Sequence, residues 1–179
     1  MPSRSGLSIA WIVGPMTYLI LEAVAAAAFP HYSYTQNFIS DLGTSASPRA
    51  VLMNMAFCVQ GTLFLVGAMF LYRAPLFLSF AAENALGNIL VATFHRGVPA
   101  HGVGAVLAIV GGNAAILAGS RVGGPSYRKV SLGLGVFGLL SFAIFAVARN
   151  GAWERCSVYS ILAWQLLTAV GVLWSRLDQ

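Results

Sequence analysis

Charge is scarce in this sequence. Of its 179 residues, 10 are Lys or Arg and 5 are Asp or Glu, together 8%, whereas an average soluble domain carries about 25% charged residues. A soluble globule of this size covers its surface with polar groups, and this chain has too few of them. The composition therefore excludes an ordinary soluble enzyme, a disordered tail and a nucleic-acid binder.

Cysteine is scarce as well. The chain has two, Cys58 and Cys156, and their predicted depths differ by about 10 Å, which is too far for a disulfide without distortion. A disulfide-stapled secreted module is thereby excluded. Both cysteines are interpreted as small apolar fillers.

Apolar residues, in contrast, make up 58% of the chain and gather in long blocks. A bilayer core about 30 Å thick requires roughly 20 helical residues. Six blocks reach that length, at 8–29, 50–72, 76–95, 102–119, 130–148 and 156–174. They are continuous rather than alternating, which indicates helices and not barrel strands. We expect an all-α integral membrane protein: a single six-transmembrane-helix bundle over residues 1–179 with no extramembrane domain.

The basic residues of the connecting segments predict the orientation. Six of them (Arg4, Arg73, Arg121, Arg128, Lys129 and Arg176) fall on the side of the two termini, against four (Arg49, Arg96, Arg149 and Arg155) on the other. Since Lys and Arg are enriched in cytoplasmic loops, both termini are predicted to be cytoplasmic, in a multi-pass protein of the cell membrane. The length of the first block and its Glu22 favour a retained helix over a cleavable signal peptide.

Small residues mark the fourth block. Gly104, Ala108 and Gly112 recur every four residues, and such a stripe lets another helix backbone approach closely. We predict that this helix lies inside the bundle, with the bulky Leu, Phe and Trp residues of the other blocks facing lipid.

Two acidic residues, Glu22 and Glu83, fall within apolar blocks, near amides such as Asn88. An ionisable side chain in hydrocarbon costs about 2.5–3.5 kcal/mol, so it should face the bundle or a cavity. For the amides, the simpler interpretation is hydrogen bonding between helices. The acids have no such simple role, because a neutral Gln would bridge helices at a lower cost.

Most other polar residues fall on the predicted extracytoplasmic side. The loop at 31–49 contains an alternating stretch, 37–43, that is typical of a short amphipathic element in the membrane interface. Two turns contribute His95, Arg96 and His101, and then Glu154 and Arg155. The predicted pocket residues are Glu22, Asn37, Ser40, Asp41, Asn88, His95, His101, Glu154 and Arg155.

Several kinds of chemistry are compatible with these residues. His95, His101 and Asp41 are metal-ligand types that could activate a water, although their spacing matches no recognised ligand pattern. A bis-histidine haem site is disfavoured because the histidines fall at helix ends. Acyl transfer by Ser40 is disfavoured because adjacent Ser and Asp do not easily flank one imidazole.

Ion pairs are the simpler alternative for the same residues. Asp41 could pair with Arg49 or Arg96, and Glu154 with Arg149 or Arg155. Such pairs would hold the loops in place without any ligand.

Three motifs carry a family resemblance: N-x-x-S-D-L-G at 37–43, the Gly97, Pro99 and His101 turn, and G-x-x-E-R at 151–155 followed by Trp164. In this order they resemble a prokaryotic six-helix membrane family catalogued as domain of unknown function 998. The segment from Gly97 to His101 departs from the family pattern, because it is short and lacks an acid. The resemblance implies the fold and singles out six positions for testing: Asn37, Ser40, Asp41, His101, Glu154 and Arg155.

The sequence thus predicts a membrane protein with a polar pocket open to the extracytoplasmic side, which binds a lipid or another amphipathic ligand. An intramembrane metal-assisted hydrolase using His95, His101 and Asp41 is the alternative, and a structural subunit of a membrane complex is the second. The predicted partners are membrane lipid, a lipid-like ligand, and a membrane protein or a second copy of the chain. Nucleic acid is not among them, and no cofactor is predicted.

Overall fold

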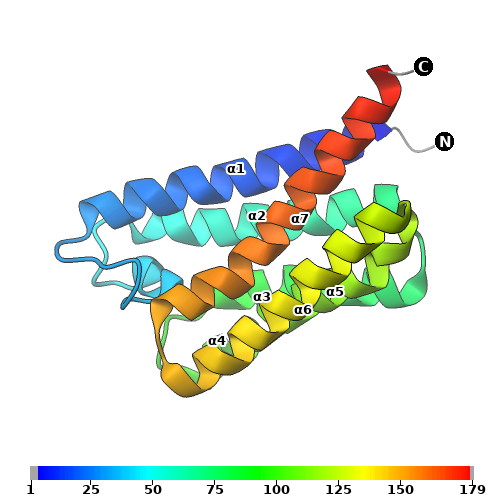
Figure 1. Cartoon of the computed structure of the whole chain (residues 1–179). Coiled ribbons are helices and arrows are strands. Elements are labelled where there is room, and N and C mark those ends of the chain that lie inside the picture. The colour runs from blue at the N-terminus through cyan, green and yellow to red at the C-terminus, as the bar shows by residue number, and fades with distance from the viewer. Residues whose placement is uncertain (1–3, 178–179) are drawn as a thin grey trace.

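The computed structural model describes residues 4–177, and this range contains helices and connecting turns but no strand. In chain order the elements are α1 (Arg4–Ala28), η1 (Ile39–Gly43), α2 (Ala50–Leu71), α3 (Pro75–Thr93), α4 (Pro99–Val106), η2 (Leu107–Gly111), α5 (Gly112–Gly119), η3 (Ser120–Val122), α6 (Pro125–Ala148) and α7 (Gly151–Leu177). Figure 1 shows the long helices side by side in one bundle. The predicted all-α fold is confirmed.

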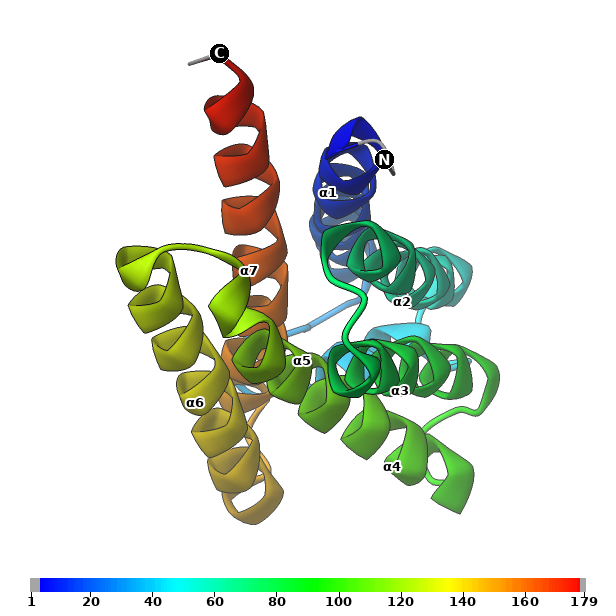
Figure 2. The same ribbon diagram turned by 90° about the vertical axis from the view of Figure 1, so that its right-hand side faces the viewer.

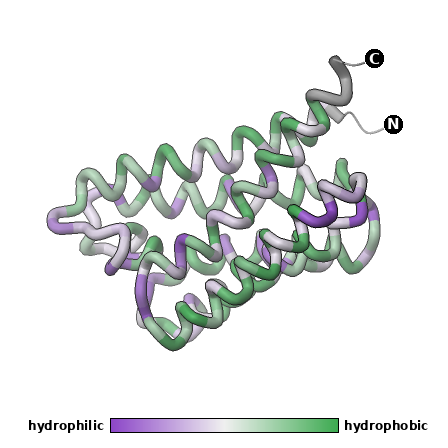
Figure 3. Tube along the Cα trace, viewed as in Figure 1, coloured by the Kyte–Doolittle hydropathy of each residue, from purple (hydrophilic) through white to green (hydrophobic). Residues whose placement is uncertain are grey.

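Six helical segments in the described range are long and apolar enough to cross a membrane: Ser5–Ala28, Ala50–Leu71, Pro75–Thr93, Pro99–Val122, Pro125–Ala148 and Gly151–Leu173. The fourth of them combines α4, η2, α5 and η3. In Figure 3 apolar colour dominates these helices, and polar colour gathers at the connecting segments. The predicted number of six long apolar helices is confirmed, and their bounds differ from the predicted ones by a few residues at some ends.

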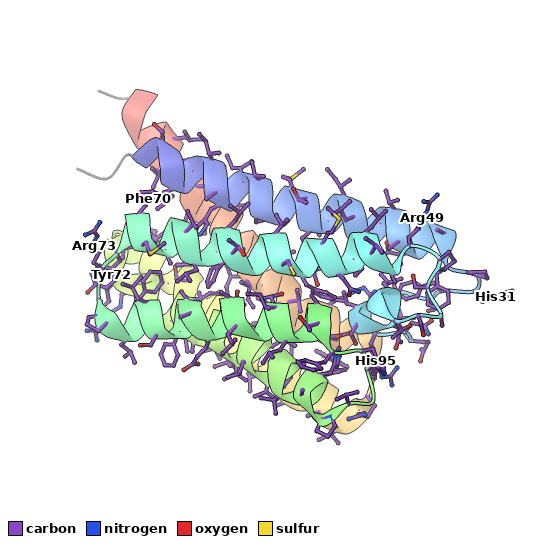
Figure 4. All side chains as sticks on the ribbon, turned by 180° about the vertical axis from the view of Figure 1, so that it is seen from behind. His31, Arg49, Phe70, Tyr72, Arg73 and His95 are labelled. Atoms are coloured by element: carbon purple, nitrogen blue, oxygen red, sulfur yellow. The ribbon has the colours of Figure 1, made fainter. Side chains whose placement is uncertain are left out.

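The bundle has two distinct ends. One carries the segment 29–49 and the turns at 94–98 and 149–150, and we call it the loop end. In Figure 4, His31, Arg49 and His95 lie at this end, whereas Tyr72 and Arg73 lie at the opposite end. The described chain ends also lie at the opposite end (Figure 1). The side chains of Arg4 and Arg176, which contribute to the predicted orientation, lie outside the described ones, and the orientation stays a prediction.

Four aromatic side chains form the core near the opposite end. Trp11, Phe64, Phe77 and Trp164 are fully buried, and the Trp11 and Trp164 ring centroids lie 5.1 Å apart. Each indole N–H has a partner inside the bundle, since Trp11 Nε1 donates to the Phe64 carbonyl at 3.0 Å and Trp164 Nε1 to Ser131 Oγ at 2.9 Å. The prediction that the tryptophans face lipid is therefore wrong for these two, because satisfied N–H groups let the indoles fill the core.

The small-residue stripe of the fourth span packs against α3, as predicted. A Cβ added at Gly87 of α3 would lie 2.2 Å from Ala108 N, and one added at Gly104 would lie 3.0 Å from Gly87 O. Half of the apolar segment of this span is buried inside the bundle, against 22% of the corresponding segment of α6. The fourth span is thus an inner helix, and α6 is the more lipid-exposed one.

A π-helical turn, η2, interrupts the fourth span. Asn84 Nδ2 of α3 donates to the Ala108 carbonyl within that turn at 2.6 Å. On either side of the turn the two halves have different neighbours: α4 packs on α3, whereas α5 packs on both α3 and α6. Figure 2 shows the result, with α4 running beneath α3 and diverging from α6 toward the loop end. Such π-turns are frequent at functional sites.

Candidate functional site

The segment between α1 and α2 folds back over the loop end. Asn37 closes its first turn, because Asn37 Oδ1 accepts from Ser33 N at 2.8 Å and Asn37 N donates to Ser33 O at 2.8 Å. Asp41 Oδ2 accepts from Phe38 N at 2.9 Å at the start of η1. η1 turns its apolar residues inward, and Ile39 and Leu42 are buried. The alternating stretch therefore packs its apolar side against the end of the bundle, and its place in the membrane interface stays a prediction.

Arg155, in the second turn of α7, fastens this segment to the helices. Its Nη1 donates to the carbonyls of Tyr34 at 2.6 Å and Asn37 at 2.9 Å, and its Nη2 donates to the Tyr32 hydroxyl. Its Nε donates to Glu22 Oε1 of α1 at 3.1 Å, in an ion pair whose side chains are 7% and 1% exposed. Arg155 thus joins α1, α7 and the intervening segment.

The hydroxyls of two tyrosines complete this anchor. Tyr159 donates to Glu22 Oε2 at 2.9 Å, and Tyr32 donates to the Phe38 carbonyl at 2.8 Å. Burial raises the pKa of Tyr32 above its ordinary value, more than the neighbouring Arg155 guanidinium lowers it. The Tyr32 hydroxyl therefore stays protonated and keeps its donor role.

Asp41 and Arg96 form a second, more exposed ion pair at the loop end. The Arg96 guanidinium lies over the Phe38 ring, 4.2 Å from its centroid, and that of Arg149 lies 6.0 Å from the same centroid. Of the pairings open to Asp41 from the sequence, the structure contains the one with Arg96.

Glu154 precedes Arg155 but faces a different part of the molecule. Its Oε2 accepts from Ile39 N at 2.6 Å, and the side chain is buried in the first turn of α7. Across from it, His101 of α4 places Nδ1 2.7 Å from the Phe94 carbonyl. These two residues lie on different helices and bound the same internal space.

That space is a small inner cavity of about 40 Å³. Its polar lining comes from η1, α2, α3, α4 and α7: Ser40, Gln60, Asn84, Asn88, His101 and Glu154. A water molecule requires about 10–15 Å³ measured in this way, so the cavity has room for about three waters. The aromatic side chains of Tyr18 and Phe57 and several aliphatic side chains complete its wall.

A larger crevice of about 570 Å³ adjoins it where α4 and α6 diverge. Its apolar wall includes Ala105, Val106, Phe142 and Phe145, and its outer part carries Arg96 and Arg149. Four residues line both the crevice and the inner cavity: Ser40, His101, Ala105 and Glu154. The two spaces therefore meet at three polar side chains, those of Ser40, His101 and Glu154, which belong to η1, α4 and α7.

The structure separates the nine predicted pocket residues into groups. Ser40, Asn88, His101 and Glu154 line the inner cavity. Glu22, Asn37 and Arg155 belong to the anchor of the loop, and Asp41 pairs with Arg96. His95 is exposed in the turn before α4 and lines neither space.

The sequence interpretation missed several residues of this site. Gln60 and Asn84 were interpreted as bridges between helices, and both also do that, Gln60 through Gln165 and Asn84 through Ala108. Phe142 and Phe145 looked like ordinary lipid-facing residues of the fifth block. A phenylalanine in an apolar helix does not indicate a binding site. These two residues line a crevice only because α4 and α6 diverge beside them.

The metal alternative is not supported by the geometry. Within residues 4–177, no three His, Cys, Asp or Glu side chains come together closely enough to hold a metal ion. His101 Nδ1 is engaged by a backbone carbonyl, and Asp41 is engaged by Arg96. The predicted set of His95, His101 and Asp41 is therefore dispersed. Cys58 and Cys156 are free thiols, as predicted.

Comparison with known proteins matches the chain to one family model, described as a protein of unknown function (DUF998), over residues 12–171. No curated protein and no solved structure matches it. The match runs from the first apolar helix into the last, and it includes all three motifs of the loop end. The chain is a multi-pass helical membrane protein that belongs to the DUF998 family.

Proposed function

We propose that this protein binds an amphipathic membrane lipid in the crevice between α4 and α6. The acyl chains lie against the apolar wall, and the headgroup reaches the polar residues of the inner cavity. The observation that carries the proposal is the junction of the two spaces at Ser40, His101 and Glu154. Ligand sites combine an apolar lining with a few convergent polar groups in this way.

Lateral access supports a lipid over a water-soluble ligand. Gly102 and Val106, which line the crevice, are exposed on the outside of the bundle. In a membrane, that surface contacts acyl chains. A lipid can therefore move sideways into the crevice without leaving the bilayer.

A substitution at Gly102 tests this proposal, because a Cβ added there has no neighbouring atom within 4 Å. Gly102→Leu fills the crevice without straining the helix and is expected to weaken lipid binding at least tenfold. Gly133→Leu is the matched control, because Gly133 of α6 is equally open but lines neither space. The measurement is lipid titration of the detergent-purified protein followed by native mass spectrometry. Equal lipid binding by both variants would remove the crevice as the site, and a structural subunit would then be the better interpretation.

We also propose that the loop end faces the extracytoplasmic side, in agreement with the distribution of basic residues. Single cysteines at the exposed Ser45 and Ser126, with Cys58 and Cys156 replaced, test it in intact cells. An impermeant thiol reagent is expected to label the cysteine at 45 and not the one at 126. The reverse pattern would place the crevice in the other leaflet.

A further inference from the structure

We propose that the preferred ligand is a zwitterionic phospholipid with a primary amine, of the phosphoethanolamine class. Its ammonium occupies the inner cavity, and its phosphate lies in the outer crevice beside Arg149. This inference rests on the proposed function and assigns the headgroup chemistry of the same site. It follows from three observations: unused acceptors, the size of the cavity and the order of the charges.

The residues that line both spaces carry acceptors without protein donors. Glu154 Oε2 accepts from Ile39 N, whereas the described part of the chain contains no hydrogen bond to Glu154 Oε1 or to the Ser40 hydroxyl. His101 adds a third acceptor. Because the Phe94 carbonyl only accepts, His101 Nδ1 is the donor of their 2.7 Å contact, and a neutral ring then carries its lone pair on Nε2.

A primary ammonium complements this set. It has three N–H donors, no acceptor and one positive charge, and the site offers a carboxylate oxygen, an imidazole nitrogen and a hydroxyl. A trimethylammonium group has no N–H to donate, and a hydroxyl headgroup brings no positive charge to the Glu154 carboxyl group. Buried charges are stable only when they are paired.

The size of the inner cavity also favours a primary ammonium over a methylated one. A space of about 40 Å³ has room for about three waters, and a primary ammonium is roughly the size of one. Three added methyl groups would have to displace Asn88 or the apolar wall. The cavity therefore favours the unmethylated amine.

The acidic and basic side chains along the crevice lie in the order that complements the charges of the headgroup. Glu154 lines both spaces, whereas Arg149 lines only the crevice. Arg96 is neutralised by Asp41, but Arg149 has no ion-pair partner among residues 4–177. Positive charge at the outside and negative charge within match a phosphate followed by an ammonium, and guanidinium groups suit phosphate oxygens.

Three lipids with identical acyl chains test the assignment by native mass spectrometry of the purified protein: phosphatidylethanolamine, phosphatidylcholine and phosphatidylglycerol. The unaltered protein is expected to bind phosphatidylethanolamine at least tenfold more tightly than either of the others. This arm requires no variant. Comparable binding of phosphatidylcholine, or tighter binding of phosphatidylglycerol, overturns the headgroup assignment.

Two variants and one control then locate the selection. Glu154→Gln keeps an acceptor for Ile39 N but removes the charge, and it is expected to reduce the preference to within about threefold. Glu83→Gln removes an acid from the membrane region outside both spaces and should leave the preference unchanged. Asn is a suitable replacement for Arg149, which has a positive φ of 52°, because Asn adopts this conformation more readily than most residues. Arg149→Asn should weaken the binding of all three lipids similarly. A full preference in Glu154→Gln would contradict the placement of the ammonium.

The outcomes separate this inference from the proposed function. If the lipids bind without headgroup preference but binding is still lost in Gly102→Leu, the crevice stands and the ammonium site falls. If Gly102→Leu has no effect, the lipid site itself falls. Soluble phosphoethanolamine that competes as strongly as the whole lipid would show a ligand without acyl chains, and it would overturn the lipid assignment.

Discussion

The two ends of the bundle are held together by different interactions. At the opposite end, Trp11, Phe64, Phe77 and Trp164 fill the space between the helices. At the loop end, the Glu22–Arg155 ion pair and its hydrogen bonds join the elements, and a cavity remains beside them. Aromatic rings fill the space between helices at the opposite end, whereas at the loop end polar side chains line the inner cavity. The space that we propose binds a lipid therefore lies at the end that depends on polar contacts.

The largest expected effect comes from breaking the polar end. Arg155→Met leaves Glu22 buried without a counter-ion, and the loss of one partner from a buried pair costs about 3–5 kcal/mol. We expect a much lower melting temperature in detergent and rapid proteolysis within residues 29–49. Arg128→Met, an exposed arginine at the opposite end, is the control. Equal melting of the two variants would show that the anchor does not hold the loop.

A smaller effect is expected from the aromatic end, where Ser131 can be compared with Ser141, a buried serine further along α6. Ser131→Ala removes the acceptor of Trp164 Nε1 and should lower the free energy of unfolding by about 1–3 kcal/mol, because a buried donor is left unpaired. Ser141 is equally buried, but its hydroxyl has no partner in the described structure. Ser141→Ala should be neutral or stabilising. A larger loss in Ser141→Ala, measured by denaturant titration, would contradict this description of the core.

The smallest effect is expected at the surface of the loop end. The Asp41–Arg96 pair is partly exposed, with Arg96 at 43%, and exposed pairs contribute about 0–1 kcal/mol. Arg96→Gln should therefore lower the melting temperature slightly, and high salt should reduce the difference. Arg73→Gln, at the exposed turn of the opposite end, provides the control. A loss as large as that of Arg155→Met would mean that both ion pairs of the loop end hold the segment equally.

The sequence predicts the helices well because hydrophobic length is a local property. The small residues Gly104, Ala108 and Gly112 also indicate a close helix contact correctly, since backbone approach requires small side chains. The position of Trp11 was predicted wrongly, because the partner of its N–H, the Phe64 carbonyl, lies on another helix. Local patterns contain no information about such partners.

The candidate site was only partly predictable for the same reason. The sequence places Asp41, His101, Glu154 and Arg155 at one depth, but depth does not specify the side of a helix. Glu154 and Arg155 are adjacent in the chain, yet one faces the cavity and the other the anchor. The crevice depends on the divergence of α4 from α6 at η2, and no local pattern in the sequence predicts a π-turn there.

The anchor formed by Arg155 also bears on biosynthesis. Glu22 belongs to α1 and Arg155 to α7, and the two residues are 133 positions apart in the chain. The ribosome therefore synthesises the intervening helices before the acid meets its counter-ion. Before α7 is in place, the segment 29–49 lacks its hydrogen bonds to Arg155, and the inner cavity lacks Glu154. The proposed lipid site is consequently completed only after α7 has been inserted.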